Sequence, residues 1–374
     1  MLNRRSFLIG CSGLITAHFL SGCQANHQRL GISLLKNSIP LQLLAKFRNS
    51  LDNPKEIDFT LETNLGDLWK LLQKDSTVLV TLGDTWLEQA IPQKLIQPLV
   101  IEELSNWQQL PSAYQELVKR NSQGYVDPQG EIWGAPYRWG TTMIAYRSDR
   151  LKEVGIVPQD WSDLWQSALK ERISLPAHSR EVIGLTLKKL GYSYNQTNLA
   201  AIPELPKELE RLNQQVKFYS SDAYLQPLIK GDTWLAVGWS TDIIPVANNY
   251  SNIEAVIPPS GTSLWVDLWV KSALTQPTAP EVELIKGWID FCWQPRSAEA
   301  ISLLTNAASP VILNAPVSGE LTKKPLVIPS PEILSKSEFL LPLNMETLAE
   351  HRALWEGLFG GQPTSSQNSA NKTE

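Results

Sequence analysis

A single aspartate lies in an otherwise apolar segment and is the residue best placed to meet a charged partner. Asp267 stands between Trp265 and Trp269. A lone carboxylate in such a segment is costly to bury, so it needs a partner inside the protein or in a ligand. Trp265 precedes it by two residues, which puts both side chains on one face of an extended strand. A pocket lined by both would offer an aromatic surface beside a negative charge.

A second carboxylate follows a predicted buried strand. Residues 77–82 form a short apolar run typical of a parallel strand, and Asp84 comes directly after it. Ligands of open α/β sheets bind at the carboxyl ends of such strands. Asp84 is therefore a candidate ligand-binding residue. The alternative is that it caps the helix that follows.

The sequence does not favour an enzyme. It contains no Gly-x-Ser-x-Gly motif, no P-loop and no His-Glu-x-x-His motif. His178 and His351 have no clustered metal-ligand partners, and Cys292 lies in an apolar helical pattern typical of a core thiol. No catalytic residue, metal or cofactor is predicted.

The elements that must position these residues alternate between strand and helix. Strands are predicted at residues 56–61, 77–82 and 234–238, and helices at 64–74, 181–190 and from 279 onward. This order predicts α/β lobes with right-handed crossovers. Turn residues at 134–137 and 257–261 interrupt the pattern and are the expected passages between lobes.

Length and composition narrow the class of protein. The 374 residues are enough for two domains or lobes, and a formal charge of −5 argues against nucleic-acid binding. Three cysteines exclude a disulfide scaffold. The 14 tryptophans outnumber each other aromatic type, but most are expected to pack in the core.

The first 22 residues are predicted to be an export signal. Arg4 and Arg5 precede an apolar run that ends before Cys23 and is too interrupted to span a membrane. The paired arginines resemble a twin-arginine signal, and residues 20–23 resemble a lipobox. Cys23 is therefore predicted to carry a lipid. An ordinary signal with a chance cysteine is the alternative.

Residues 130–146 resemble the crossover of bacterial extracellular solute-binding proteins, in particular the spermidine/putrescine-binding proteins of polyamine ABC importers. Four more segments agree in order and spacing, at residues 161–165, 179–192, 238–240 and 259–267. The resemblance implies a type 2-like periplasmic-binding-protein fold, in which two α/β lobes joined by hinge strands close over a ligand cleft. It also implies capture of a small cationic amine and delivery to an ABC permease.

The matched positions imply specific ligand contacts. Asp267 and Glu181 would accept the ammonium groups, and Trp265 and Trp239 would form aromatic walls. The family's second carboxylate, one turn before Glu181, is replaced here by His178. That histidine either lines the pocket or lies on the ordinary surface.

Part of the family's aromatic box is also missing, near residues 37–39, at Thr85 and at Ala307. Asp84 and Trp86 are the candidate substitutes for a charge and a wall. These departures leave open a degenerate member of the family that binds another small ligand, or serves as a periplasmic scaffold or sensor.

The predicted organisation assigns every part of the chain. Residues 1–22 form the signal and 23–29 a tether; lobe 1 comprises 30–137 and 262–315, lobe 2 comprises 138–261 and 316–359, and 360–374 form a disordered tail. We expect a monomer in the periplasm, attached to the membrane only by the lipid on Cys23.

Overall fold

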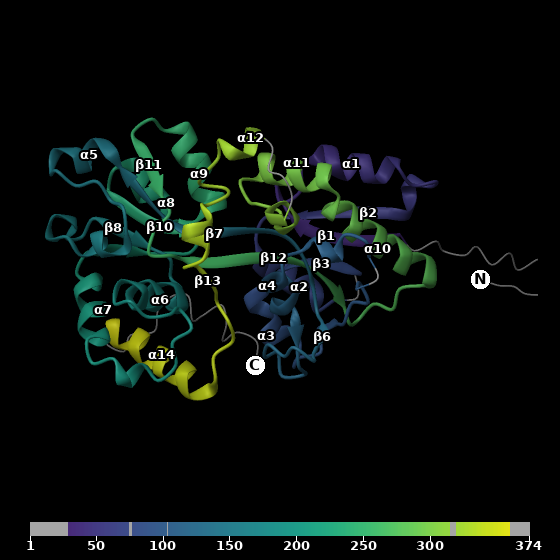
Figure 1. Cartoon of the computed structure of the whole chain (residues 1–374), viewed down its shortest axis with the longest axis horizontal. Coiled ribbons are helices and arrows are strands. Elements are labelled where there is room, and N and C mark those ends of the chain that lie inside the picture. The colour runs from purple at the N-terminus through teal and green to yellow at the C-terminus, as the bar shows by residue number, and fades with distance from the viewer. Residues whose placement is uncertain (1–28, 75–76, 103, 315–318, 360–374) are drawn as a thin grey trace, which may run out of the picture.

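The computed structural model describes residues 29–74, 77–102, 104–314 and 319–359. The predicted signal, Cys23 and the C-terminal tail lie outside the described residues. Two α/β lobes lie side by side, with one sheet of 11 strands running through both (Figure 1). Its main path has the order β2-β1-β3-β12-β7-β10-β8-β9.

The first lobe is built on parallel strands. β1 pairs in parallel with both β2 and β3, and the returning β12 closes the row antiparallel to β3. Its strands are β1 (Leu30–Leu35), β2 (Ile57–Glu62), β3 (Leu79–Gly83), β4 (Ile96–Gln97), β5 (Lys119–Arg120), β6 (Glu131–Ile132) and β12 (Ser263–Ser272). Its helices are α1 (Leu41–Asn49), α2 (Leu65–Leu72), α3 (Leu87–Ala90), α4 (Ser112–Leu117), α10 (Ala279–Trp293), α11 (Pro295–Thr305) and α12 (Gly319–Thr322).

The second lobe continues the sheet from β7 (Ala135–Arg147), which pairs with β10 and β11, while β8 pairs with β10 and β9. Its other strands are β8 (Ile173–Leu175), β9 (Val216–Tyr219), β10 (Leu235–Trp239) and β11 (Ile253–Val256). Its helices are α5 (Ser148–Glu153), α6 (Ser179–Lys189), α7 (Leu205–Asn213), α8 (Leu225–Lys230), α9 (Ser240–Asn249) and α14 (Met345–Leu358). Short 3-10 helices include η2 (Asp84–Trp86) after β3 and η4 (Trp161–Trp165) after α5.

The strand β7 passes from one lobe to the other. It pairs with β12 up to Thr141 and with β10 from Thr142 onward. The prediction of a turn over residues 134–137 was wrong, because Ala135 already begins this strand and all 13 of its residues are buried. The apolar character of β7 is that of a strand covered on both faces. The chain therefore passes from the first lobe to the second near Thr141, within one continuous strand.

The chain crosses again near its C-terminus. The short helix α12 packs on α11 of the first lobe, and α14 packs on α6 and α7 of the second. Between them come α13 (Pro331–Leu334) and β13 (Glu338–Phe339), whose residues pair with Ser263 and Leu264 of β12. The division of the chain at 137/138 and 315/316 stays a prediction, and this packing favours passages a few residues later in both places.

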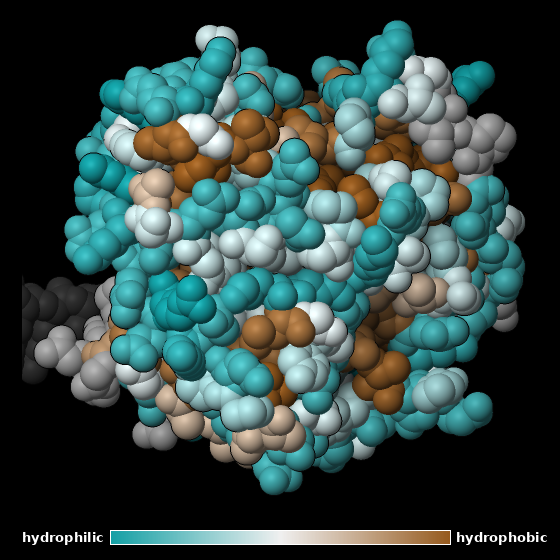
Figure 2. Space-filling view, turned by 60° about the vertical axis from the view of Figure 1, so that its left-hand side comes forward, coloured by the Kyte–Doolittle hydropathy of each residue, from teal (hydrophilic) through white to brown (hydrophobic). Residues whose placement is uncertain are grey.

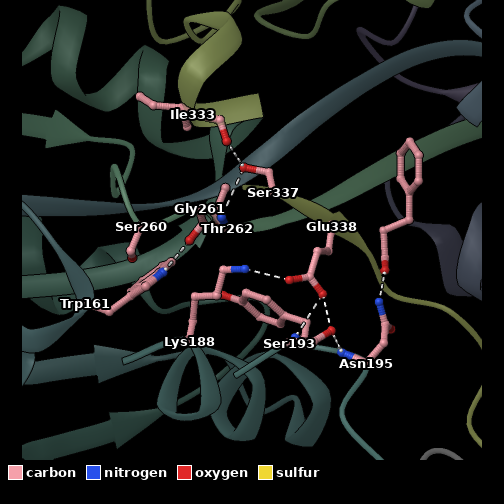
Figure 3. A network of polar contacts seen from close by, with 12 residues as sticks. Trp161, Lys188, Ser193, Asn195, Ser260, Gly261, Thr262, Ile333, Ser337 and Glu338 are labelled. Carbon is pink, nitrogen blue, oxygen red and sulfur yellow. Dashed lines mark hydrogen bonds and ion pairs between the residues drawn. The ribbon is translucent and has the colours of Figure 1, made fainter. Parts of the chain in front are cut away.

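A polar network fixes this last passage against the second lobe (Figure 3). Glu338 accepts hydrogen bonds from the backbone N–H of Tyr194 and the Oγ of Ser193, and forms an ion pair with Lys188 of α6 at 2.5 Å. On its other side, the Glu338 N–H donates to the carbonyl of Thr262. Glu338 thus links α6 to the segment that leads into β12.

Most predicted elements are confirmed. α2 begins after Asn64, whose side chain accepts from the N–H of Asp67 as an N-cap, and α6 is followed by Gly191 in the left-handed conformation. The predicted core faces of α10 are buried, and Cys292 is 1% exposed. On the face shown in Figure 2, hydrophilic surface predominates and apolar side chains gather in separate patches.

Candidate ligand-binding site

Side chains of β12 and β7 lie next to one another where the two lobes join. On β12, Trp265 and Asp267 lie opposite Gly140 and Arg138 of β7. A Cβ on Gly140 would lie 2.3 Å from both the Trp265 ring and the Oγ of Ser240. The absence of a side chain at residue 140 therefore lets the indole of Trp265 lie directly on the strand between the lobes.

Asp267 has a partner inside the protein. Its Oδ2 accepts a hydrogen bond from the Nε of Arg138 at 2.6 Å, and the two residues are 4% and 6% exposed. Burial raises the pKa of Asp267, and the guanidinium opposes that shift. Asp267 is therefore not a free carboxylate waiting for a ligand ammonium, as the resemblance had implied.

Arg138 is a charged residue of this candidate site that the sequence reasoning missed. Its guanidinium carbon also lies 5.8 Å from the centre of the Trp265 ring, within the range of a cation–π contact. The signal was present, because Arg138 is itself a charge within the apolar segment that became β7. Two opposite charges in two buried segments predict a pair, and Asp267 already required a partner.

Glu181 lies on the second-lobe side of the site that contains Trp265 and Asp267. It lies in the first turn of α6 and is 3% exposed, and its carboxylate accepts from the hydroxyls of Thr142 and Ser263 at 2.7–3.1 Å. Burial raises its pKa to about 6, since these hydroxyl bonds and the charge of Arg180 offset the loss of water only in part. Within the described residues, no lysine or arginine forms an ion pair with Glu181.

Asp84 is a buried carboxylate with one unsatisfied oxygen, and the charge of Arg120 offsets its burial only in part. It is 2% exposed; Oδ1 accepts from the backbone N–H of Val266 at 3.0 Å, while the buried Oδ2 has no hydrogen-bond partner within the described residues. Burial raises its pKa to about 7. The alternative role as a helix cap is wrong, because Gly83 holds the N-cap position of η2 and the Asp84 side chain bonds to β12. Asp84 thereby joins the group formed by Trp265 and Asp267.

Trp239 and Trp86, the other two tryptophans predicted to line the site, have different surroundings. Trp239 ends β10 opposite Thr142, and its half-buried ring meets Tyr224 edge-on at 5.8 Å. Trp86 packs its ring on Trp69 of α2 at 5.0 Å. Trp239 therefore lies beside the Glu181 end of the site, whereas the contacts of Trp86 are those of a packing residue.

Asp242 is another acidic group that the sequence reasoning did not select. It lies in the first turn of α9, and one of its carboxylate oxygens accepts from the hydroxyl of Tyr224 at 2.9 Å. Burial raises its pKa, and the positive charge of Arg138 opposes that shift. Asp242 and Asp267 thus share the field of one guanidinium.

His178 is the N-cap of α6. Its Nδ1 accepts from the N–H of Glu181 at 3.3 Å, so this nitrogen carries no proton. Burial, with a smaller effect from Arg180, lowers its pKa to about 4. His178 is therefore neutral near pH 7 and adds no positive charge beside Glu181.

Replacing His178 with alanine should lower the free energy of unfolding by about 1 kcal/mol, the usual cost of losing an N-cap. Asparagine at this position should preserve the cap. Because the pKa of His178 is below its unfolded value of 6.5, its contribution to stability is lost as the pH falls from about 6.5 toward about 4. Urea unfolding of the wild type and the His178→Asn variant at several pH values should show a smaller acid loss in the variant. Equal losses in both would contradict this assignment, since His351, whose pKa is also lowered to about 4, remains in each.

The fold and the arrangement between its lobes are those of a protein that closes around a small solute. Residues 77–336 match the family model described as bacterial extracellular solute-binding protein, and the chain belongs to this family. Among curated relatives, it is 25% identical to the spermidine/putrescine-binding periplasmic protein of Salmonella typhimurium, over 75% of this chain and 81% of that one. It is 26% identical to the putrescine/cadaverine-binding protein of Pseudomonas aeruginosa, over 62% and 68% of the two chains.

Solved structures support the periplasmic-binding-protein fold. The spermidine/putrescine ABC transporter substrate-binding protein of Streptococcus pneumoniae superimposes with a TM-score of 0.74 at 19% identity, covering 89% of this chain and 99% of that one. A lipoprotein of Treponema pallidum gives a TM-score of 0.66 at 17% identity, covering 88% and 99%. In the part of the chain that the structure describes, no helix is long and apolar enough to cross a membrane.

Proposed function

We propose that this protein captures a small amine, of the class represented by putrescine and spermidine, and delivers it to an ABC importer. The observation that carries the proposal is the pair of buried carboxylates, Asp84 and Glu181. Within the described residues neither forms an ion pair, and the charges of Arg120 and Arg180 offset their burial only in part. A buried carboxylate is costly without a compensating charge. A ligand ammonium would supply that charge and satisfy the unpartnered Oδ2 of Asp84.

The surfaces between the carboxylates suit the rest of such a ligand. Methylene groups gain from contact with flat apolar faces. Trp265 on β12 and Trp239 on β10 are half-buried, and these two strands lie on either side of β7. An ammonium near an indole face gains about 0.5–2 kcal/mol. The names of the relatives support the same ligand class.

Access to the site requires movement. Asp84 comes from the first lobe and Glu181 from the second, and both are almost completely buried. The amine would enter when the lobes separate and would favour the closed arrangement through contacts with both. We place the protein in the periplasm as a monomer held by a lipid on Cys23, with an ABC permease as its partner. Family membership supports the transport role.

The test is a titration of the chain lacking its first 23 residues with putrescine and spermidine, by calorimetry and thermal unfolding. A ligand at 100 times its dissociation constant should add about 2.7 kcal/mol to the free energy of unfolding. The Asp84→Asn/Glu181→Gln double variant should fold and lose this stabilisation. If no amine stabilises the wild type at millimolar concentration, the proposed function is wrong.

A further inference from the structure

The segment around β13 places two neighbouring side chains in two different cores. Phe339 is half-buried and packs against the core that contains Tyr114 and Trp139. Leu340 is 6% exposed and belongs to the core of the second lobe, with Trp355. Successive side chains of an extended segment point in opposite directions, so one short strand can reach both cores. This segment therefore contacts both lobes.

The backbone of this segment is fixed to the second lobe (Figure 3). The Nδ2 of Asn195 donates to the carbonyl of Phe339 at 2.8 Å, and its Oδ1 accepts from the N–H of Leu341 at 2.8 Å. Arg180 of α6 donates to the carbonyl of Leu341 at 2.8 Å and to Asn195 at 3.0 Å. Together with the bonds of Glu338 to α6, these contacts make the segment part of the second lobe.

The ring of Phe339 nevertheless reaches the first lobe. It meets Tyr114 of α4 edge-on, with the ring centroids 5.1 Å apart and the ring planes at 77°. Tyr114 is 4% exposed and also contacts Trp139, in the part of β7 that pairs with β12. Aromatic pairs attract one another at centroid distances up to about 7 Å. A displacement of one lobe by about 2 Å relative to the other would therefore end this contact.

Tyr114 also borders the candidate ligand site. Burial raises the pKa of its hydroxyl, and the nearby charge of Asp84 raises it further. Asp84 bonds to the N–H of Val266, and Val266 lies opposite Trp139, on which Tyr114 packs. The contact between Tyr114 and Phe339 thus lies close to Asp84, although Phe339 is not a predicted ligand contact.

We propose that the edge contact of Phe339 with Tyr114 is a latch between the lobes, which holds part of the ligand-free protein closed and raises the affinity for the ligand. The apparent dissociation constant rises in proportion as the closed fraction falls. An edge-to-face aromatic pair of ordinary strength shifts such an equilibrium by about two- to tenfold. The effect on affinity rests on the proposed function, whereas the effect on the ligand-free lobes does not.

Distances between spin labels on the two lobes test the latch without a ligand. In the chain lacking its first 23 residues, Gln89→Cys on α3 and Glu346→Cys on α14 place labels at exposed positions of the two lobes, and the native Cys292 is 1% exposed. Pulsed EPR of the ligand-free wild type should show a population at the distance of the closed structure described above and a second population displaced from it. Phe339→Ala should raise the ratio of the second population to the first by about two- to tenfold.

Three further variants make the test specific. Tyr114→Phe keeps the ring, so its distance distribution should equal that of the wild type. Phe359→Ala removes a matched contact, because Phe359 meets Tyr219 edge-on at 5.2 Å within the second lobe; it should leave the distances unchanged. If Phe339→Ala does not fold, Phe339→Leu keeps the apolar bulk without the ring and should shift the populations in the same direction.

The outcomes separate the latch from the proposed function. Calorimetry with putrescine and spermidine should give a dissociation constant about two- to tenfold higher for Phe339→Ala than for the wild type or Phe359→Ala. If the wild type lacks the closed population, or if Phe339→Ala leaves the distances unchanged, the latch is overturned and the proposed function stands. If neither amine binds at millimolar concentration while Phe339→Ala still shifts the distances, the proposed function is overturned and the latch stands.

Discussion

Replacing Asp267 with asparagine is expected to lower the free energy of unfolding by about 3–5 kcal/mol, because it removes one partner of a buried ion pair and leaves the other charge uncompensated. The partner is Arg138, which is 6% exposed and bonds to Asp267 at 2.6 Å. Equilibrium unfolding in urea at pH 7 measures this loss.

Two comparisons make the measurement specific. The Arg138→Met/Asp267→Leu double variant removes both charges and should be neutral or stabilising relative to the wild type, because neither charge must then be buried. Glu320→Gln disrupts the exposed pair with Lys323 and should cost no more than about 1 kcal/mol. A loss as small for Asp267→Asn as for Glu320→Gln would contradict the pairing described above.

The affinity for an amine is expected to rise by well over 100-fold between about pH 5 and pH 7, of which the ionisation of Asp84 gives about 50-fold and that of Glu181 about tenfold. The cause is Asp84, whose pKa of about 7 means that it must lose a proton before it can pair with an ammonium. Glu181, with a pKa of about 6, adds a smaller rise at the acid end. Calorimetry in buffers of different ionisation enthalpy should detect the protons released on binding.

The Asp84→Asn variant isolates this effect. Its affinity should be lower at pH 7 and should level off near pH 6, because only Glu181 still titrates in that range. A wild-type affinity that stays constant from about pH 5 to pH 8 would show that the ammonium binds elsewhere.

The stability of the ligand-free protein should change in the opposite direction. Asp84 has a folded pKa raised above the unfolded value of 3.8, so the folded protein keeps a proton that the unfolded chain has lost. The contribution of this group to stability therefore falls as the pH rises from about 4 to about 7. At neutral pH, ionised Asp84 thus lowers the free energy of unfolding of the ligand-free protein and raises its affinity for a cation.

Local patterns were sufficient to predict most elements near the site. The spacing of Leu65, Leu68, Trp69 and Leu72 gave α2, and the alternation of Trp265 and Asp267 placed both on one face of β12. Family resemblance identified Glu181 at the start of α6. These features depend on neighbours within a few residues of each other.

The pairing of Arg138 with Asp267 could not be predicted in the same way. The two residues are 129 positions apart, and their alignment depends on the register between β7 and β12, which shifts between Asp267 and Leu268. A slip of one residue would have turned one of the side chains to the other face. The contact of Trp86 with Trp69 likewise depends on how α2 packs beside η2, and no periodicity in either segment contains that information.

Gly140 lies in β7 beside Trp265, one residue before the pairing passes from the first lobe to the second. If the lobes rotate about this point, displacement grows with distance from it. The proposed ligand contacts would then move least, and the ends of the lobes far from β7 would move most. In such a rotation the proposed ligand site would lie close to the pivot. A membrane partner that grips both distal ends would sense occupancy as a change in their separation, without ever touching the bound molecule.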